Sequence, residues 1–178
     1  TFLAPRLIRR WSVDRRHRDV ELTQVHRELT SMVIPVVQHD RAQERRARLA
    51  WFREDWPEMA RAYEALTLLI PGNGESHFRL GFARLFLGQF KQAIPAFTRA
   101  SELDFMRPSA TYNVACCHSR LGEIDAALSE LRRALEQGFD NQALLKEDPD
   151  LANVRADPRY ALLLKEWLEK RSGTGQKP

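Results

Sequence analysis

The chain has 178 residues, of which 43% are hydrophobic and 29% charged, and it carries a net charge of +4. This composition supplies a substantial core, excludes an intrinsically disordered chain, and is rich in strong helix formers. The positive charge is concentrated in residues 1–54, where 12 arginines face 7 acidic residues.

The N-terminal segment, residues 1–38, is basic and contains one predicted amphipathic helix, at 12–34. Its apolar residues are spaced by threes and fours, as on one face of a helix: Leu22, Val25, Leu29, Met32, Val33 and Val36. Pro35 is expected to end it or to begin the next helix. We expect this helix to cover the open end of the domain that follows. A dimerising coiled coil is the less favoured alternative, because fewer than the ~3–4 heptads that it needs are present.

The central part of the chain repeats with a period of 34 residues. Residues 74–107 and 108–141 align without a gap, with identities at Leu87/Leu121, Gly88/Gly122, Ala93/Ala127, Arg99/Arg133, Ala100/Ala134, Glu102/Glu136 and Phe105/Phe139. Small residues recur where two helices must approach closely, and the shared glycine lies midway, where a tight turn fits. Each unit is therefore predicted to be a helix pair, at 75–87 with 90–103 and at 109–121 with 124–137.

These residues resemble the tetratricopeptide repeat, which has a 34-residue period. The small and large positions of its helices are matched by Gly81, Ala93 and Phe97, and then by Ala115, Ala127 and Leu131. A third, degenerate unit is read at 40–73. The resemblance implies an all-α, right-handed solenoid of antiparallel helix pairs over residues 40–141, with N-terminal and C-terminal capping helices.

The C-terminal region contains two Asp-Pro pairs, which favour helix starts near 149 and near 158. The second helix would present one apolar face, formed by Tyr160, Leu163, Leu164, Trp167 and Leu168. Residues 142–171 are therefore predicted to be capping helices that shield the last repeat from water. Residues 172–178 are expected to be a disordered tail.

No motif in the sequence indicates catalysis. It has no glycine-rich phosphate loop and no HExxH pattern, and Cys116, Cys117 and His118 would point about 100° apart on a helix, so they could not share a metal. We expect no enzyme activity, no cofactor and no metal, with both cysteines packed as buried thiols. Two adjacent cysteines also fit a reducing, cytoplasmic location.

The resemblance implies a binding surface, because the first helix of each tetratricopeptide unit lines a concave groove that holds peptides. Transferred to this sequence, the candidate partner-binding residues are Arg48, Phe52, Phe78, Arg79, Phe82, Tyr112, Asn113, Cys116 and Arg120. The aromatic residues would provide apolar contacts and the arginines would select acidic ones. Some family members clamp a terminal carboxylate, but here Glu44 replaces the expected lysine and only Asn113 matches.

The leading hypothesis is therefore a protein-interaction scaffold or adaptor that binds a peptide or partner protein with apolar anchors and acidic residues. A first alternative is the cytoplasmic domain of a protein anchored in the membrane upstream of Thr1. The segment from Thr1 to Trp11 is apolar and then rich in arginine, which is typical of the cytoplasmic flank of a transmembrane helix. A second alternative is a nucleic-acid-associated factor, since Trp11 stands among arginines.

Overall fold

The computed structural model describes residues 41–173. Of these, residues 43–173 belong to one compact unit. The amphipathic helix predicted at 12–34 lies outside the described residues. In the described part of the chain, no helix is long and apolar enough to cross a membrane.

Helices account for all regular structure within residues 41–173. A helical stretch at 41–52 is followed by α3 (Trp56–Leu69), α4 (Gly74–Phe86), α5 (Phe90–Glu102), α6 (Arg107–Arg120), α7 (Ile124–Glu136), α8 (Gln142–Glu147), the 3-10 turn η1 (Pro149–Leu151), α9 (Ala152–Arg155) and α10 (Pro158–Gly173). The two predicted helix pairs are confirmed by α4 with α5 and by α6 with α7.

The turns within the helix pairs repeat with the same 34-residue spacing. Gly88 and Gly122 follow the first helices of their pairs with φ of 71° and 75°, in the left-handed region that glycine adopts without strain. Glu54 occupies the equivalent position in the first pair with φ of 54°. Side-chain caps then start some of the helices: Asp55 accepts the backbone N–H of Glu58 at the start of α3.

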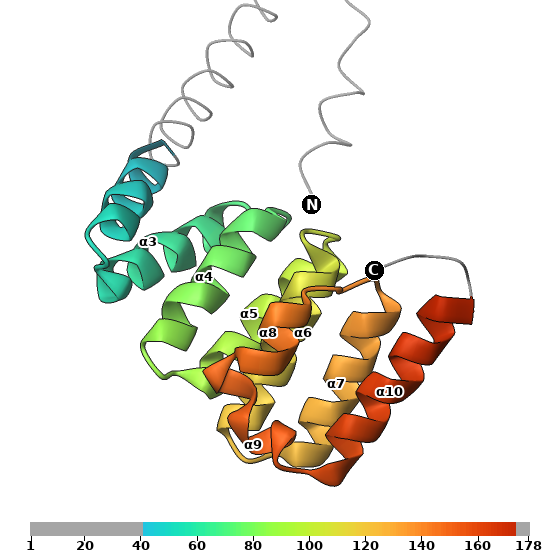
Figure 1. The fold of residues 1–178 in the computed structure, drawn as a ribbon. Coiled ribbons are helices and arrows are strands. Elements are labelled where there is room, and N and C mark those ends of the chain that lie inside the picture. Colours follow the sequence, from blue (N-terminus) through green and yellow to red (C-terminus); the bar gives the residue numbers. More distant parts are fainter. Residues whose placement is uncertain (1–40, 174–178) are drawn as a thin grey trace, which may run out of the picture. The chain divides into compact units, whose positions relative to one another are not determined.

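Close helix packing depends on the small residues of the repeat. Gly81 of α4 lies against Phe97 of α5, whose side chain is fully buried. Successive helices pack on one another, α3 on α4, α4 on α5, α5 on α6 and α6 on α7, so that the apolar core runs through the row of helices (Figure 1). The result is the predicted all-α solenoid of stacked helix pairs.

The C-terminal helices continue the 34-residue register beyond the predicted repeats. α10 begins at Pro158, which is 34 residues after the start of α7 at Ile124. The place of the preceding helix is taken by α8, η1 and α9. Asp148 separates α8 from η1, and its backbone is extended (ψ 119°) before Pro149. Proline disfavours helical geometry in the residue before it and cannot donate a backbone hydrogen bond. Residues 142–173 thus form a fourth helix pair with a broken first helix.

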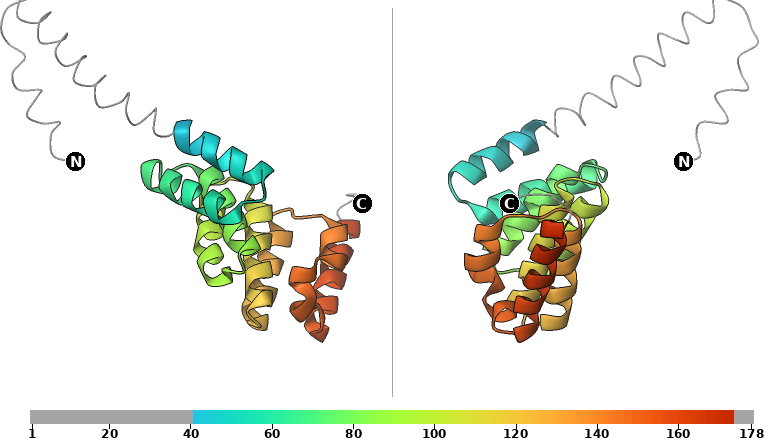
Figure 2. Two further views of the ribbon diagram at one scale, coloured as in Figure 1. Left: turned by 90° about the vertical axis from the view of Figure 1, so that its left-hand side faces the viewer. Right: turned by 45° about the vertical axis from the view of Figure 1, so that its right-hand side comes forward.

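The predicted C-terminal cap is largely confirmed. Tyr160 and Leu163 are buried, and Leu164 and Trp167 pack against the same core as Leu131 of α7. Figure 2 shows the backbone of α10 beside that of α7. Two details of the prediction are wrong. Leu168 is 46% exposed, and α10 continues to Gly173, so that residues 172 and 173 belong to the helix rather than to a tail.

Candidate functional site

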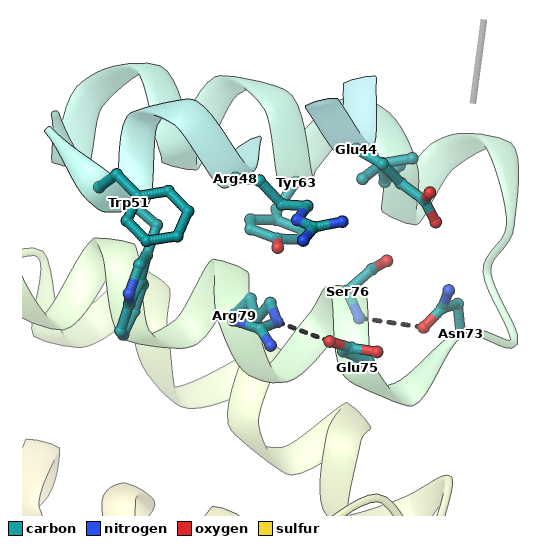
Figure 3. A pocket seen from close by; sticks show the side chains of 10 residues that line it. Glu44, Arg48, Trp51, Tyr63, Asn73, Glu75, Ser76 and Arg79 are labelled. Atoms are coloured by element: carbon teal, nitrogen blue, oxygen red, sulfur yellow. Dashed lines mark hydrogen bonds and ion pairs between the residues drawn. The ribbon is translucent and has the colours of Figure 1, made fainter. Parts of the chain in front are cut away.

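A cleft of about 450 Å³ opens between the helix at 41–52 and α4. Residues of α3 line it as well, and Figure 3 shows the side chains around it. We call it the inter-unit cleft, and it is lined by Glu44, Arg48, Trp51, Phe52, Tyr63, Leu66, Asn73, Glu75, Ser76 and Arg79.

The repeat explains why the cleft is open at this junction. In the second and third units, an aromatic pair fills the equivalent space: Phe78 lies against Phe105 with ring centroids 5.7 Å apart, and Tyr112 stacks on Phe139 at 4.1 Å. The corresponding residues of the first unit, 34 positions earlier, are Glu44 and Pro71. Because neither of these is aromatic, no ring pair closes the first junction.

Two of the four charged side chains in the cleft are paired with each other. Arg79 Nε donates to Glu75 Oε1 at 2.7 Å, within one turn of α4. The other two, Glu44 and Arg48, form no hydrogen bond or ion pair with any residue in 41–173. The cleft therefore presents one unpaired carboxylate and one unpaired guanidinium on the same helix.

Tyr63 of α3 lies between these charges at the base of the cleft (Figure 3). Its burial raises the pKa of the phenol above the ordinary value of 10.0. The nearby Arg79 and Arg48 lower this pKa, whereas Glu75 and Glu44 raise it further. Tyr63 therefore stays neutral at physiological pH, and the charge of the cleft comes from its glutamates and arginines alone.

One end of the cleft is aromatic and exposed. Phe52 is 81% exposed and Trp51 is 41% exposed. The Trp51 ring packs edge-on against Trp56 at 5.8 Å, and Trp56 in turn stacks on Phe86 at 4.3 Å. Since Trp51 is held by these ring contacts, this end offers a supported apolar surface to a ligand.

Three of the predicted site residues, Arg48, Phe52 and Arg79, lie in this cleft. Phe78 and Phe82 lie outside it. The burial of Phe78 contradicts the expectation that its side chain faces an open groove, whereas the predicted partner contact of Phe82 stays a prediction. Phe78 is only 9% exposed and packs on Phe97, while Phe82 is partly buried and contacts two core clusters. Their apolar side chains contribute more to packing against α5 than they could in contact with water.

Two of the predicted site residues of α6, Tyr112 and Cys116, are covered by the fourth helix pair, whereas Arg120 is exposed. Tyr112 and Cys116 are 2% and 1% exposed, so the expectation that they face a groove is wrong as well. Tyr112 Oη donates to Asp148 Oδ2 at 2.7 Å, and Arg120 pairs with Asp150 at 2.5 Å.

Asn113 of α6 is partly buried and also lies outside the cleft. Cys116 and Cys117 are buried free thiols, as the sequence predicted. Burial raises the pKa of both, to about 12 for Cys117, so neither is a reactive thiolate at neutral pH.

The transferred site did not include Trp51, Tyr63, Asn73, Glu75 or Ser76. A signal for the cleft was nevertheless present in the sequence. Comparing the units position by position shows Glu44 where the others carry Phe78 and Tyr112. That substitution marks the first junction as the one that its own side chains do not fill.

Comparison with known proteins places this arrangement in a family. The tetratricopeptide repeat family matches residues 74–105 and 108–137. A chloroplast protein of Arabidopsis thaliana is 42% identical over 60 residues, which is 34% of this chain and 18% of that protein. The chain thus matches less than a fifth of the length of this curated relative.

Solved structures share the fold. The type III secretion chaperone SycD of Yersinia enterocolitica, in complex with a peptide of the translocator YopD, superposes with a TM-score of 0.52 at 21% identity, covering 74% of this chain and 93% of SycD. The TPR2B domain of yeast Sti1, in complex with pHsp70, gives 0.52 at 19% identity, covering 75% and 99%. Residues 74–105 and 108–137 are thus tetratricopeptide repeats, and the chain shares the helical solenoid fold of these structures.

Proposed function

We propose that this protein is a protein-interaction module that binds a peptide segment of its partner in the inter-unit cleft. The observation that carries the proposal is the unfilled first junction, where Glu44 and Arg48 have no ion-pair partner among residues 41–173 and Phe52 is exposed. Charged groups without partners next to exposed aromatic rings are features of surfaces that gain contacts on binding. In the later units the positions of Glu44 and Arg48 carry buried or partly buried side chains, Phe78 with Phe82 and Tyr112 with Cys116.

Similar proteins support a peptide as the ligand class. The structures of SycD and of the Sti1 TPR2B domain both contain a peptide or protein partner. Their identities to this chain, 21% and 19%, support the shared fold, and the inter-unit cleft provides the argument from this chain itself. No catalytic role is part of the proposal.

The proposal is tested by selecting binders from a library of displayed random peptides on the full chain. Affinities of the selected peptides are then measured by fluorescence anisotropy for the wild type, Phe52→Ala and Arg48→Glu. Loss of a hot-spot side chain costs about 2 kcal/mol, so each variant should bind roughly thirtyfold more weakly. Both side chains are exposed, so the helical circular dichroism spectrum should not change.

Matched controls separate the cleft from the rest of the surface. Leu162→Ala removes an apolar side chain that is 59% exposed on α10, and Lys91→Glu reverses an exposed charge on α5. Neither residue lines the cleft, so both controls should bind like the wild type. If Phe52→Ala and Arg48→Glu also bind like the wild type, the peptide contacts another surface and the proposal is wrong.

The membrane-anchored and nucleic-acid alternatives depend on residues 1–11, outside the described residues. No observation on residues 41–173 favours either one, and the cytoplasmic location also stays a prediction. A protein-interaction module is compatible with all three.

A further inference from the structure

We infer that the inter-unit cleft selects an extended peptide whose alternate side chains are basic, acidic and apolar, contacting Glu44, Arg48 and Phe52 in that order. This inference rests on the proposed function, since it assumes that a peptide occupies the cleft. It differs from the sequence-based expectation of a partner with acidic flanks, because the cleft has unpaired groups of both signs.

The spacing of the three residues matches that of an extended chain. Glu44, Arg48 and Phe52 follow one another at intervals of four residues on the helix at 41–52, and all three line the cleft. Four residues advance a helix by about 6 Å. Two residues advance an extended strand by about 6.6 Å and return the side chain to the same face. Ligand positions i, i+2 and i+4 would therefore follow the three residues in register.

The charges determine which ligand side chain fits each position. Arg79 is already neutralised by Glu75 at 2.7 Å. The unpaired groups are thus Glu44, which favours a basic ligand side chain, and Arg48, which favours an acidic one. A ligand with only acidic side chains would meet the carboxylates of Glu44 and Glu75 at one end of the cleft (Figure 3).

The aromatic end determines the third position. Phe52 and Trp51 lie one helical turn beyond Arg48, away from Glu44. An apolar ligand side chain packed there would remove exposed ring surface from water, which contributes roughly 25 cal/mol per Å². A carboxylate at this position would lose hydration without gaining a partner.

The chemistry of the selected peptides provides the first test. The full chain is used to select from the displayed random library, and the enriched sequences are aligned. We expect a basic, an acidic and an apolar residue at alternate positions, in either chain direction. Enriched peptides that depend on Phe52 but lack this order would overturn the inference and leave the proposed function intact. A failure to enrich any peptide would count against both.

A charge exchange provides the second test. In the variant E44R/R48E the two unpaired charges trade places, while Phe52 and the Glu75–Arg79 pair are untouched. Two synthetic peptides of equal composition are compared, one with the order basic, acidic, apolar and one with the order acidic, basic, apolar. The wild type should prefer the first peptide by about tenfold or more, and the variant should prefer the second. If the wild type and the variant both bind the two peptides with equal affinity, the cleft does not distinguish the order of the charges.

Discussion

At the scale of single residues, the fold depends on positions that have no room for a larger side chain. A Cβ atom added to Gly81 would lie 2.7 Å from the buried Phe97 ring. We therefore expect Gly81→Ala to force α4 and α5 apart, at a cost of about 1–3 kcal/mol in the free energy of unfolding. Chemical denaturation followed by circular dichroism measures this change.

The matched control for this prediction is Gly72→Ala. A Cβ at Gly72 would meet no atom within 4 Å, and its φ does not lie in the left-handed region. This variant should be as stable as the wild type or slightly more stable, because alanine restricts the unfolded chain. If both variants have the same stability, the contact with Phe97 does not limit the packing.

Gly81 also shows what a sequence reveals about single residues and what it does not. The small size of this residue could be predicted from the repeat, because the equivalent residue of the next unit is Ala115. In each unit the second helix carries a large residue, Phe97 or Leu131, that needs this space. The accessibility of Phe78 and Tyr112 could not. Helical periodicity shows which face a side chain occupies, but not whether the next helix covers that face. The open cleft follows only when Glu44 is compared with these two residues.

At the scale of elements, the broken first helix of the fourth pair is held on α6 by Tyr112 and Asp148. The phenol donates to the carboxylate at 2.7 Å. Removing the carboxylate leaves the buried phenol without its acceptor, and removing the phenol hydroxyl takes a donor from Asp148. Tyr112→Phe and Asp148→Ala should therefore show a coupling energy of about 1–2 kcal/mol in a double-mutant cycle. Equilibrium unfolding of the four proteins measures it. Tyr112→Phe combined with Asp104→Ala, which is not part of this contact, should be additive.

A second prediction at this scale concerns α10. Its Tyr160 and Leu163 complete the core around Leu131 and Leu135 of α7. Deletion of residues 156–178 removes this cover, so we expect exposed apolar surface, a lower melting temperature and aggregation in light scattering. A shorter deletion, of residues 174–178, is the control and should behave like the full chain. A monomeric 1–155 protein with an unchanged melting temperature contradicts the capping role.

The same elements mark the limits of prediction from repeats. The 34-residue period placed α4 to α7, because each unit carries the same small, large and turn residues. The start of α10 was also predicted, from Asp157 and Pro158. The start of α8 within the predicted capping region was not, because the chain from Gln142 to Glu147 shares no diagnostic residue with the other units. Its 34-residue register and the burial of Leu145 in the same core as Tyr112 show that it belongs to a fourth pair.

At the scale of the whole molecule, the ionisation of the tyrosines reports on folding, because every tyrosine of the chain is buried in the folded state. The three residues, Tyr63, Tyr112 and Tyr160, come from α3, α6 and α10. Burial raises the pKa of each phenol above its ordinary value of 10.0, to about 12 for Tyr160. A group whose pKa is higher in the folded state destabilises the fold as pH rises. The contribution of each tyrosine to the free energy of unfolding is fully present below pH 10 and is lost as pH rises through the pKa of the folded state.

We therefore expect folded and unfolded protein to titrate differently in alkali. In 6 M guanidinium chloride, absorbance at 295 nm should report tyrosinate formation centred near pH 10. The folded chain should form little tyrosinate at that pH, and the remainder should appear together with loss of helical circular dichroism at higher pH. The free energy of unfolding should begin to fall near pH 9, where the thiols of Cys116 and Cys117 ionise in the unfolded chain. If one tyrosine ionises near pH 10 while the helical signal is intact, the helix pair that contains it opens separately from the others.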